Sequence, residues 1–136
     1  MPIRDEKTYA IMSYQDFLVS HSRLKKGKLR LSAFRAYKAE RRMLQSLAMK
    51  HDLHRKDTKC AVPKYEMLKT AKELEKHYPG IYQLTEKALS LFDEWKNNNA
   101  RKEDIQDLLK ELNYDWIKHH LTGEMIERIR ELQKTM

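Results

Sequence analysis

The spacing of apolar residues constrains the fold of this chain more than any other feature of its sequence. In residues 64–78 and 81–96, apolar side chains recur every three or four positions, which places them along one face of an α-helix. The chain also has only three glycines and three prolines, so it is poor in the residues that form tight hairpin turns. Together these two features predict an all-α fold.

The same spacing divides the chain into about six helices within a single compact domain, residues 1–136. Residues 1–12 are expected to form a loosely docked leader, residues 13–60 a basic part with short helices, and residues 63–136 a charge-balanced part with four helices. The aperiodic stretch between the two parts has only nine residues, 54–62, which is short for a linker between domains. The expected helices cover residues 14–25, 33–53, 64–78 and 81–96, the stretch around 105–112, a short element over 116–121, and a last helix after residue 122.

Side chains that accept hydrogen bonds from the backbone mark the expected starts of several helices. Ser13 with Asp16, Ser32, Asn99 and Thr122 are the candidate N-cap residues. The apolar positions on the inward faces of the helices then predict the core. It is expected to contain Phe34, Tyr37, Leu44, Leu68, Leu74, Leu84, Leu91, Trp95, Ile105, Leu108, Leu112, Ile117, Ile129 and Leu132.

The positive charge of the chain is confined to one stretch. Between His21 and Lys64 there are fourteen Lys and Arg residues and three acidic residues, whereas the segments before and after sum to −1 and −2. The net charge of +8 therefore comes from this stretch alone, and such a confined cationic surface attracts a polyanionic partner. The candidate contact residues are Arg23, Lys25, Lys26, Lys28, Arg30, Arg35, Lys38, Arg41, Arg42, Arg55, Lys56 and Lys59.

Nucleic acid is the polyanion that we expect, because Lys and Arg neutralise phosphates and Arg can also stack on bases. The contacts should be mostly independent of base sequence, and the sequence does not distinguish DNA from RNA. Residues 102–133 are too acidic to serve as a helix-turn-helix reader. The alternative is a protein–protein adaptor or inhibitor, of a viral or mobile-element type, whose basic face docks on an acidic protein or a ribonucleoprotein.

The residue patterns argue against catalysis. The three glycines are isolated and form no phosphate-cradling motif, and Cys60 has no positioned base beside it in the sequence. His51 and His54 could share a helical face, but a zinc ion needs further ligands. His119 and His120 are adjacent, and on an α-helix adjacent side chains point about 100° apart, so we do not expect them to bind one ion. We therefore expect a protein that is not an enzyme and that has no metal ion or cofactor.

The remaining features bear on where the chain resides. Its longest apolar run is only a few residues, whereas a membrane span needs about 20. Residues 1–10 are charged and do not resemble a secretory signal, and a single cysteine excludes a disulfide within the chain. These features predict an intracellular protein without a membrane partner, and they leave its oligomeric state open.

Overall fold

The computed structural model describes residues 4–57 and 61–136. Within them the chain is all-helical, with six α-helices, two 3₁₀-helices and no strand, which confirms the predicted fold class. The elements are α1 (Glu6–Lys25), α2 (Leu29–Lys50), η1 (Lys64–Glu66), α3 (Met67–Leu74), α4 (Ile81–Lys96), α5 (Lys102–Glu111), η2 (Tyr114–His120) and α6 (Gly123–Lys134).

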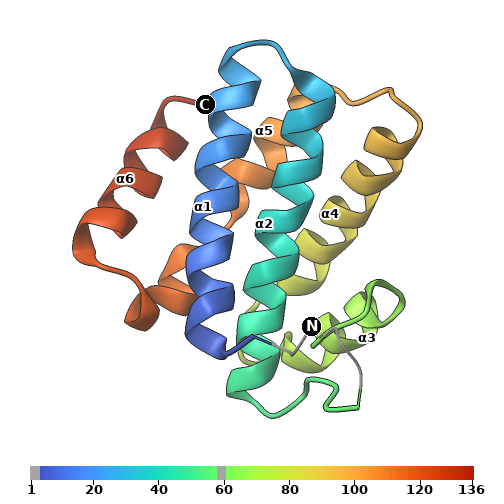
Figure 1. Cartoon of the computed structure of the whole chain (residues 1–136), viewed down its shortest axis with the longest axis vertical. Helices are drawn as coiled ribbons and strands as arrows, with labels where there is room; N and C mark the ends of the chain where they lie inside the picture. The colour runs from blue at the N-terminus through green and yellow to red at the C-terminus, as the bar shows by residue number, and fades with distance from the viewer. Residues whose placement is uncertain (1–3, 58–60) are drawn as a thin grey trace.

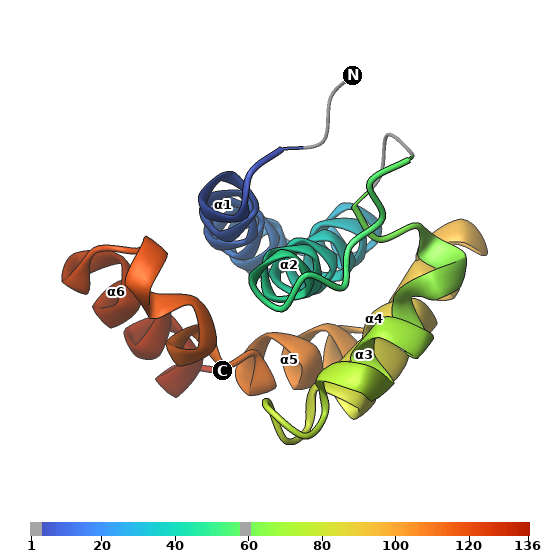
Figure 2. The same cartoon turned by 90° about the horizontal axis from the view of Figure 1, so that it is seen from below.

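The helices form two layers around one hydrophobic core. Helices α1 and α2 run antiparallel as a hairpin, and α3, α4, α5 and α6 lie in an arc against one side of it (Figures 1 and 2). The core is a single buried cluster to which each of the six α-helices contributes. The outward side of the α1–α2 hairpin is left uncovered by the other helices, as Figure 2 shows.

Helices α1 and α2 pack closely because small side chains lie where they meet. The Ser20 hydroxyl donates to the carbonyl of Ser32 at 2.9 Å, and the Ser32 hydroxyl donates to the carbonyl of Ser20 at 2.8 Å. Further along, the Ser13 hydroxyl donates to the carbonyl of Ala39 at 2.6 Å. All four residues are fully buried, so these bonds replace the water that the hydroxyl groups lose on folding.

The ends of the first two helices differ from those expected. Helix α1 begins at Glu6 rather than near residue 14, because the Asp5 carboxylate caps it by accepting from the Thr8 backbone N–H at 2.7 Å. The leader expected over residues 1–12 is therefore shorter. Ser13 and Ser32 lie inside helices and cap neither, whereas the predicted cap at Thr122 is confirmed by its bond from the Met125 N–H.

The predicted core is largely confirmed. Phe34, Leu68, Trp95 and Leu132 are only partly buried, and the other ten predicted positions are buried. Each α-helix also contributes buried apolar residues that were missing from the prediction. Those of α1 are Tyr9, Ala10, Phe17 and Leu24, of which the first two fall in the expected leader. No helix among the described residues is both long enough and apolar enough to cross a bilayer.

Candidate nucleic-acid interface

Three exposed lysines surround the turn that joins α1 to α2. Lys25, Lys26 and Lys28 flank Gly27, whose φ of +75° is a left-handed conformation that glycine adopts without strain. The Gly27 N–H donates to the carbonyl of Leu24 at 3.1 Å, and the Lys28 N–H donates to that of Arg23 at 2.9 Å. This pair of bonds ends α1 in a Schellman motif, so the turn is tight and holds the three lysines close together.

The start of α2 adds its own positive end to this turn. In the described structure no side chain caps α2, and its first turn contains no acidic residue. The first N–H groups of a helix lack partners within the helix and favour an anion. Arg30 is turned away from this end, because its Nε donates to the Trp95 carbonyl at 3.1 Å and its guanidinium lies over the Trp95 ring.

Further along α2, three cations lie beside α1 rather than on a freely exposed face. Arg35 donates from Nη1 to Asp16 Oδ1 at 2.8 Å, and Lys38 lies over the ring of Phe34. Arg42 lies over the ring of Tyr9. All three cations are half-buried against α1 or their own helix.

Partial burial changes the electrostatics of these groups. Burial lowers the pKa of the Lys38 ammonium, and the positive charge of Arg42 lowers it further. Burial also raises the pKa of the Asp16 carboxyl, although its hydrogen bond from Arg35 acts in the opposite direction. Positive charges are thus crowded around one carboxylate, and an incoming phosphate would reduce their mutual repulsion.

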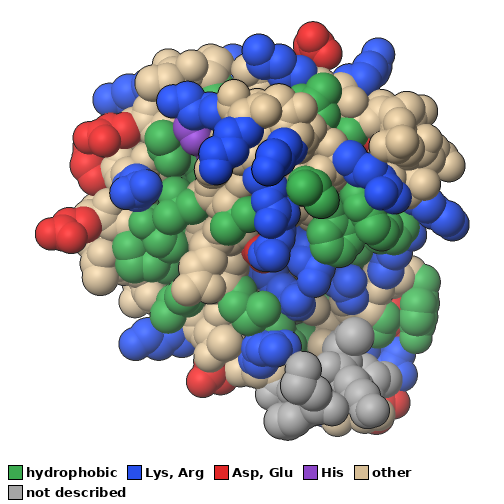
Figure 3. All heavy atoms as spheres, turned by 45° about the horizontal axis from the view of Figure 1, so that its top comes forward, with side chains coloured by type: hydrophobic (Ala, Val, Ile, Leu, Met, Phe, Trp, Pro, Cys, Tyr) green, Lys and Arg blue, Asp and Glu red, His purple; other side chains and the backbone are tan. Residues whose placement is uncertain are grey.

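The turn lysines and the cations beside α1 form one continuous surface, which we call the basic band. Figure 3 shows its Lys and Arg side chains running down the outward face of the hairpin, with hydrophobic side chains on either side. At one end, Arg23, Lys26 and Lys28 line a shallow depression together with Leu18 and Val19. The basic band consists of Arg23, Lys25, Lys26, Lys28, Arg35, Lys38 and Arg42.

Other predicted contact residues are not brought together with the basic band. Arg41 donates to the Tyr37 hydroxyl at 3.2 Å and to the Val62 carbonyl at 3.3 Å, so it joins α2 to the segment that precedes α3. Arg55 pairs with Asp57 and Glu66, and Lys56 pairs with Asp52. Lys59, like Cys60, lies outside the described residues.

Asp16 and Tyr9 contact cations of the basic band, but neither was predicted from the sequence as part of the site. Asp16 was interpreted as half of a helix cap, and Tyr9 as part of the leader. Their spacing did carry a signal, because Tyr9, Ser13, Asp16 and Ser20 recur every three or four residues and so share one helical face. That face is polar, and its partners are supplied by α2.

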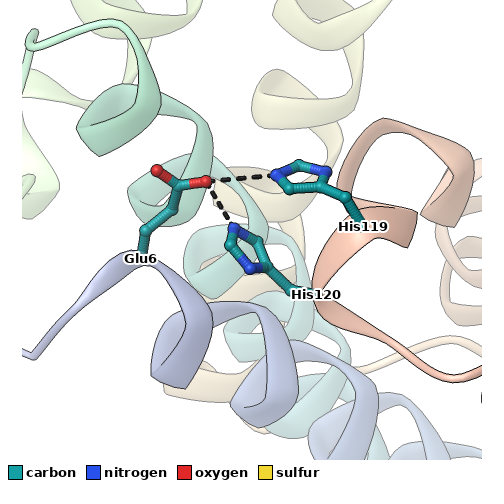
Figure 4. A group of neighbouring side chains, drawn as sticks. All are labelled: Glu6, His119 and His120. Carbon is teal, nitrogen blue, oxygen red and sulfur yellow. Dashed lines mark hydrogen bonds and ion pairs between the residues drawn. The ribbon is translucent and has the colours of Figure 1, made fainter.

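A second cluster joins the start of α1 to the end of η2. Glu6 lies at the start of α1, and His119 and His120 lie at the end of η2, yet both imidazole rings point toward the Glu6 carboxylate (Figure 4). The expectation that adjacent histidines diverge was wrong here, because both rings face the same carboxylate and their centroids are 4.0 Å apart. Burial raises the pKa of the Glu6 carboxyl, but hydrogen bonds from His120 and His119 outweigh this effect and lower it.

No protein-family model, curated protein or solved structure matches this chain.

Proposed function

We propose that the protein is a non-catalytic nucleic-acid-binding protein whose basic band holds the phosphate backbone. The observation that carries the proposal is the continuity of the band. The three exposed lysines of the turn and the crowded cations beside α1 lie on one face that no other helix covers (Figures 2 and 3). Such a face can lie against an extended chain of phosphates without any rearrangement of the fold.

The dimensions of the band suit a nucleic-acid backbone. Lys28 and Arg42 are fourteen positions apart along the sequence of α2, which corresponds to about 21 Å at 1.5 Å per residue. A nucleic-acid strand advances about 3.4 Å per nucleotide along the axis of a duplex, so the band spans roughly six nucleotides. Around five phosphate contacts would follow, giving a slope of about −4.5 for log affinity against log salt on duplex DNA.

Each part of the band has a distinct role in this proposal. The turn lysines are compact charges on flexible stems, which suits sequence-independent phosphate contacts. The uncapped start of α2 can receive one phosphate on its N–H groups. Arg35 already donates to Asp16, so we expect Lys38 and Arg42 to contribute most of the net charge beside α1.

The test replaces the three turn lysines. Lys25→Gln, Lys26→Gln and Lys28→Gln together remove three positive charges from exposed positions and leave the core untouched. Binding to duplex DNA, duplex RNA and single strands of one sequence is measured by electrophoretic shift and by titration from low to moderate salt. Wild-type protein should bind with the steep slope given above. The variant should bind at least tenfold more weakly, and its slope should be shallower by about one for each phosphate that it no longer binds.

The matched control removes the same number of charges elsewhere. Lys69, Lys72 and Lys76 are exposed and lie among Glu66, Glu73 and Glu75, so replacing these three lysines with Gln should leave binding almost unchanged. If both triple variants lost the same affinity for nucleic acid, binding would depend only on the net charge of the protein. The basic band would then not be the binding site. Absence of binding by the wild-type protein at low salt would end the proposal.

The alternative of docking on an acidic protein or ribonucleoprotein is favoured by one observation. Leu31 lies in the first turn of α2, next to the turn lysines, and is 46 % exposed. An exposed leucine beside cations suits a protein partner that is both apolar and acidic. Capture from cell extract with and without nuclease treatment distinguishes the two functions. A partner that survives nuclease, and that the turn-lysine variant fails to capture, supports the adaptor.

A further inference from the structure

The Glu6–His119–His120 cluster brings three metal-binding side chains together although they lie at opposite ends of the sequence. The Nε2 atoms of both histidines face the same atom, Glu6 Oε2, and the His119 contact measures 3.2 Å. The donor atoms of all three residues lie within 4.8 Å of one another. The two imidazole rings lie with their centroids 4.0 Å apart, so they approach the carboxylate from neighbouring directions, as Figure 4 shows.

We propose that this cluster is a binding site for a divalent transition-metal ion, with Zn²⁺ as the best match. Zinc binds histidine nitrogens and carboxylate oxygens at about 2.0–2.2 Å, so two of its ligands lie about 3.3 Å apart in tetrahedral geometry. The Glu6–His119 separation of 3.2 Å is close to that value. Two nitrogens and one oxygen favour zinc over calcium or magnesium, which prefer sites made of oxygen atoms.

The backbone around the cluster holds its ligands in place. The Ser46 hydroxyl of α2 donates to the carbonyl of Glu6 at 2.9 Å, and Asp5 caps the helix turn that carries Glu6. On the other side, the ring of Trp116 in η2 packs against Tyr78. Both ligand-bearing segments are therefore anchored to the bundle, which reduces the ordering that a metal ion would otherwise have to impose.

Metal binding would replace the hydrogen bonds that now join the three side chains. In the structure each Nε2 faces the carboxylate, which requires a proton on that nitrogen. A bound ion requires a lone pair there instead, so each ring must carry its proton on Nδ1 and any additional proton must leave. Three protein ligands leave a fourth position open for water.

The test is a zinc titration of the full chain with the single thiol removed. Cys60→Ser takes away the one cysteine, and competition with a chromophoric chelator at pH 7.5 then reports affinity and stoichiometry. We expect one Zn²⁺ per chain. Glu6→Gln and His120→Asn, each made separately, should lower the affinity by at least about tenfold. Zinc should also raise the melting temperature of the parent protein, and it should do so much less in either variant.

The control uses the other histidine pair of the same end of the bundle. His51 and His77 lie with their rings stacked 4.3 Å apart, and His77 is exposed, so His77→Asn should leave zinc affinity unchanged. Equal weakening by His77→Asn would place the ion elsewhere and overturn the assignment. Absence of zinc binding in the parent protein, or binding that both Glu6→Gln and His120→Asn leave intact, would show that the cluster is an ion pair only. None of these outcomes depends on whether the basic band binds nucleic acid.

Discussion

At the scale of single residues, the most unusual group in the molecule is the carboxyl of Glu40. It lies inside α2, is 1 % exposed, and accepts a hydrogen bond from the Thr85 hydroxyl at 3.0 Å. Its other oxygen has no hydrogen-bond partner among the described residues. Burial raises the pKa of Glu40 to about 8, because a charged carboxylate is poorly solvated there. Glu40 is therefore neutral in the folded protein at pH 7.

Glu40 should make the stability of the fold depend on pH. Between its unfolded pKa near 4.5 and its folded pKa of about 8, the folded state holds one more proton than the unfolded state. Stability must then fall as pH rises through this interval, by about 3 kcal/mol between pH 5 and pH 8. Glu40→Gln, which stays neutral and can still accept from Thr85, should remove this part of the pH dependence. Urea unfolding at several pH values measures the effect.

Glu86 provides the comparison for this prediction. It lies on the same helix as Thr85 but is exposed, so Glu86→Gln should leave the pH profile of wild type unchanged. If Glu40→Gln and wild type keep parallel profiles from pH 5 to pH 8, the Glu40 carboxyl is already charged when the protein folds, and its pKa assignment fails.

At the scale of elements, the helices that were predicted well are those with an apolar inward face. Helix α4, for example, begins and ends as expected, because its leucines and aromatic residues repeat at helical spacing and face the core. Helix α1 was predicted too short, because its contact face toward α2 is made of serines and Asp16. Polar residues on a face do not reveal burial until the partner helix supplies their hydrogen bonds.

Contacts between polar side chains of different helices were also not predictable from the sequence at the candidate site. The charge excess between residues 21 and 64 falls on the end of α1, on α2 and on the segment that follows α2. The half-buried character of the cations beside α1 was not predictable, since Arg35 finds Asp16 nineteen residues away in sequence. The convergence of Glu6 with the two histidines was even less accessible from the sequence, since 113 residues separate Glu6 from His119.

The close approach of α1 and α2 should make their contact face intolerant of large side chains. Ser20 is fully buried and exchanges two hydrogen bonds with Ser32, so Ser20→Leu would force the helices apart and break both bonds. We expect a decrease of about 1–3 kcal/mol in the free energy of unfolding, measured with urea. Ser22, two residues away, is exposed, and Ser22→Leu should change stability by less than about 0.5 kcal/mol. Similar decreases from both variants would contradict the packing described for this face.

At the scale of the whole molecule, charge is distributed unevenly between the two layers. The basic band lies on the α1–α2 hairpin, whereas α5 has four acidic and two basic residues and α6 has three of each. Like charges that are crowded for binding repel one another in the free protein. The fold therefore tolerates a local instability where it is proposed to bind its partner.

This repulsion should be measurable without any ligand. Replacing Lys25, Lys26 and Lys28 with Gln should stabilise the free protein by about 0.5–1 kcal/mol at low salt, and the gain should disappear near 0.5 M NaCl. The Lys69, Lys72 and Lys76 triple variant should show no such gain, since those lysines lie among glutamates. Urea unfolding at low salt and near 0.5 M NaCl measures this gain in stability. A gain that persists in high salt would mean that charge repulsion is not its cause.

The contact between Glu6 and the two histidines also has a consequence for the order in which the protein folds. The α1–α2 hairpin closes over a turn of a few residues, whereas Glu6 must meet partners 113 and 114 residues further along the chain. Closing so long a loop costs more entropy, so this contact should form after the rate-limiting step of folding. Interactions absent from the transition state affect how fast a protein unfolds rather than how fast it folds. Strengthening this contact, for example with the proposed metal ion, would thus lengthen the lifetime of the folded state and leave the folding rate unchanged.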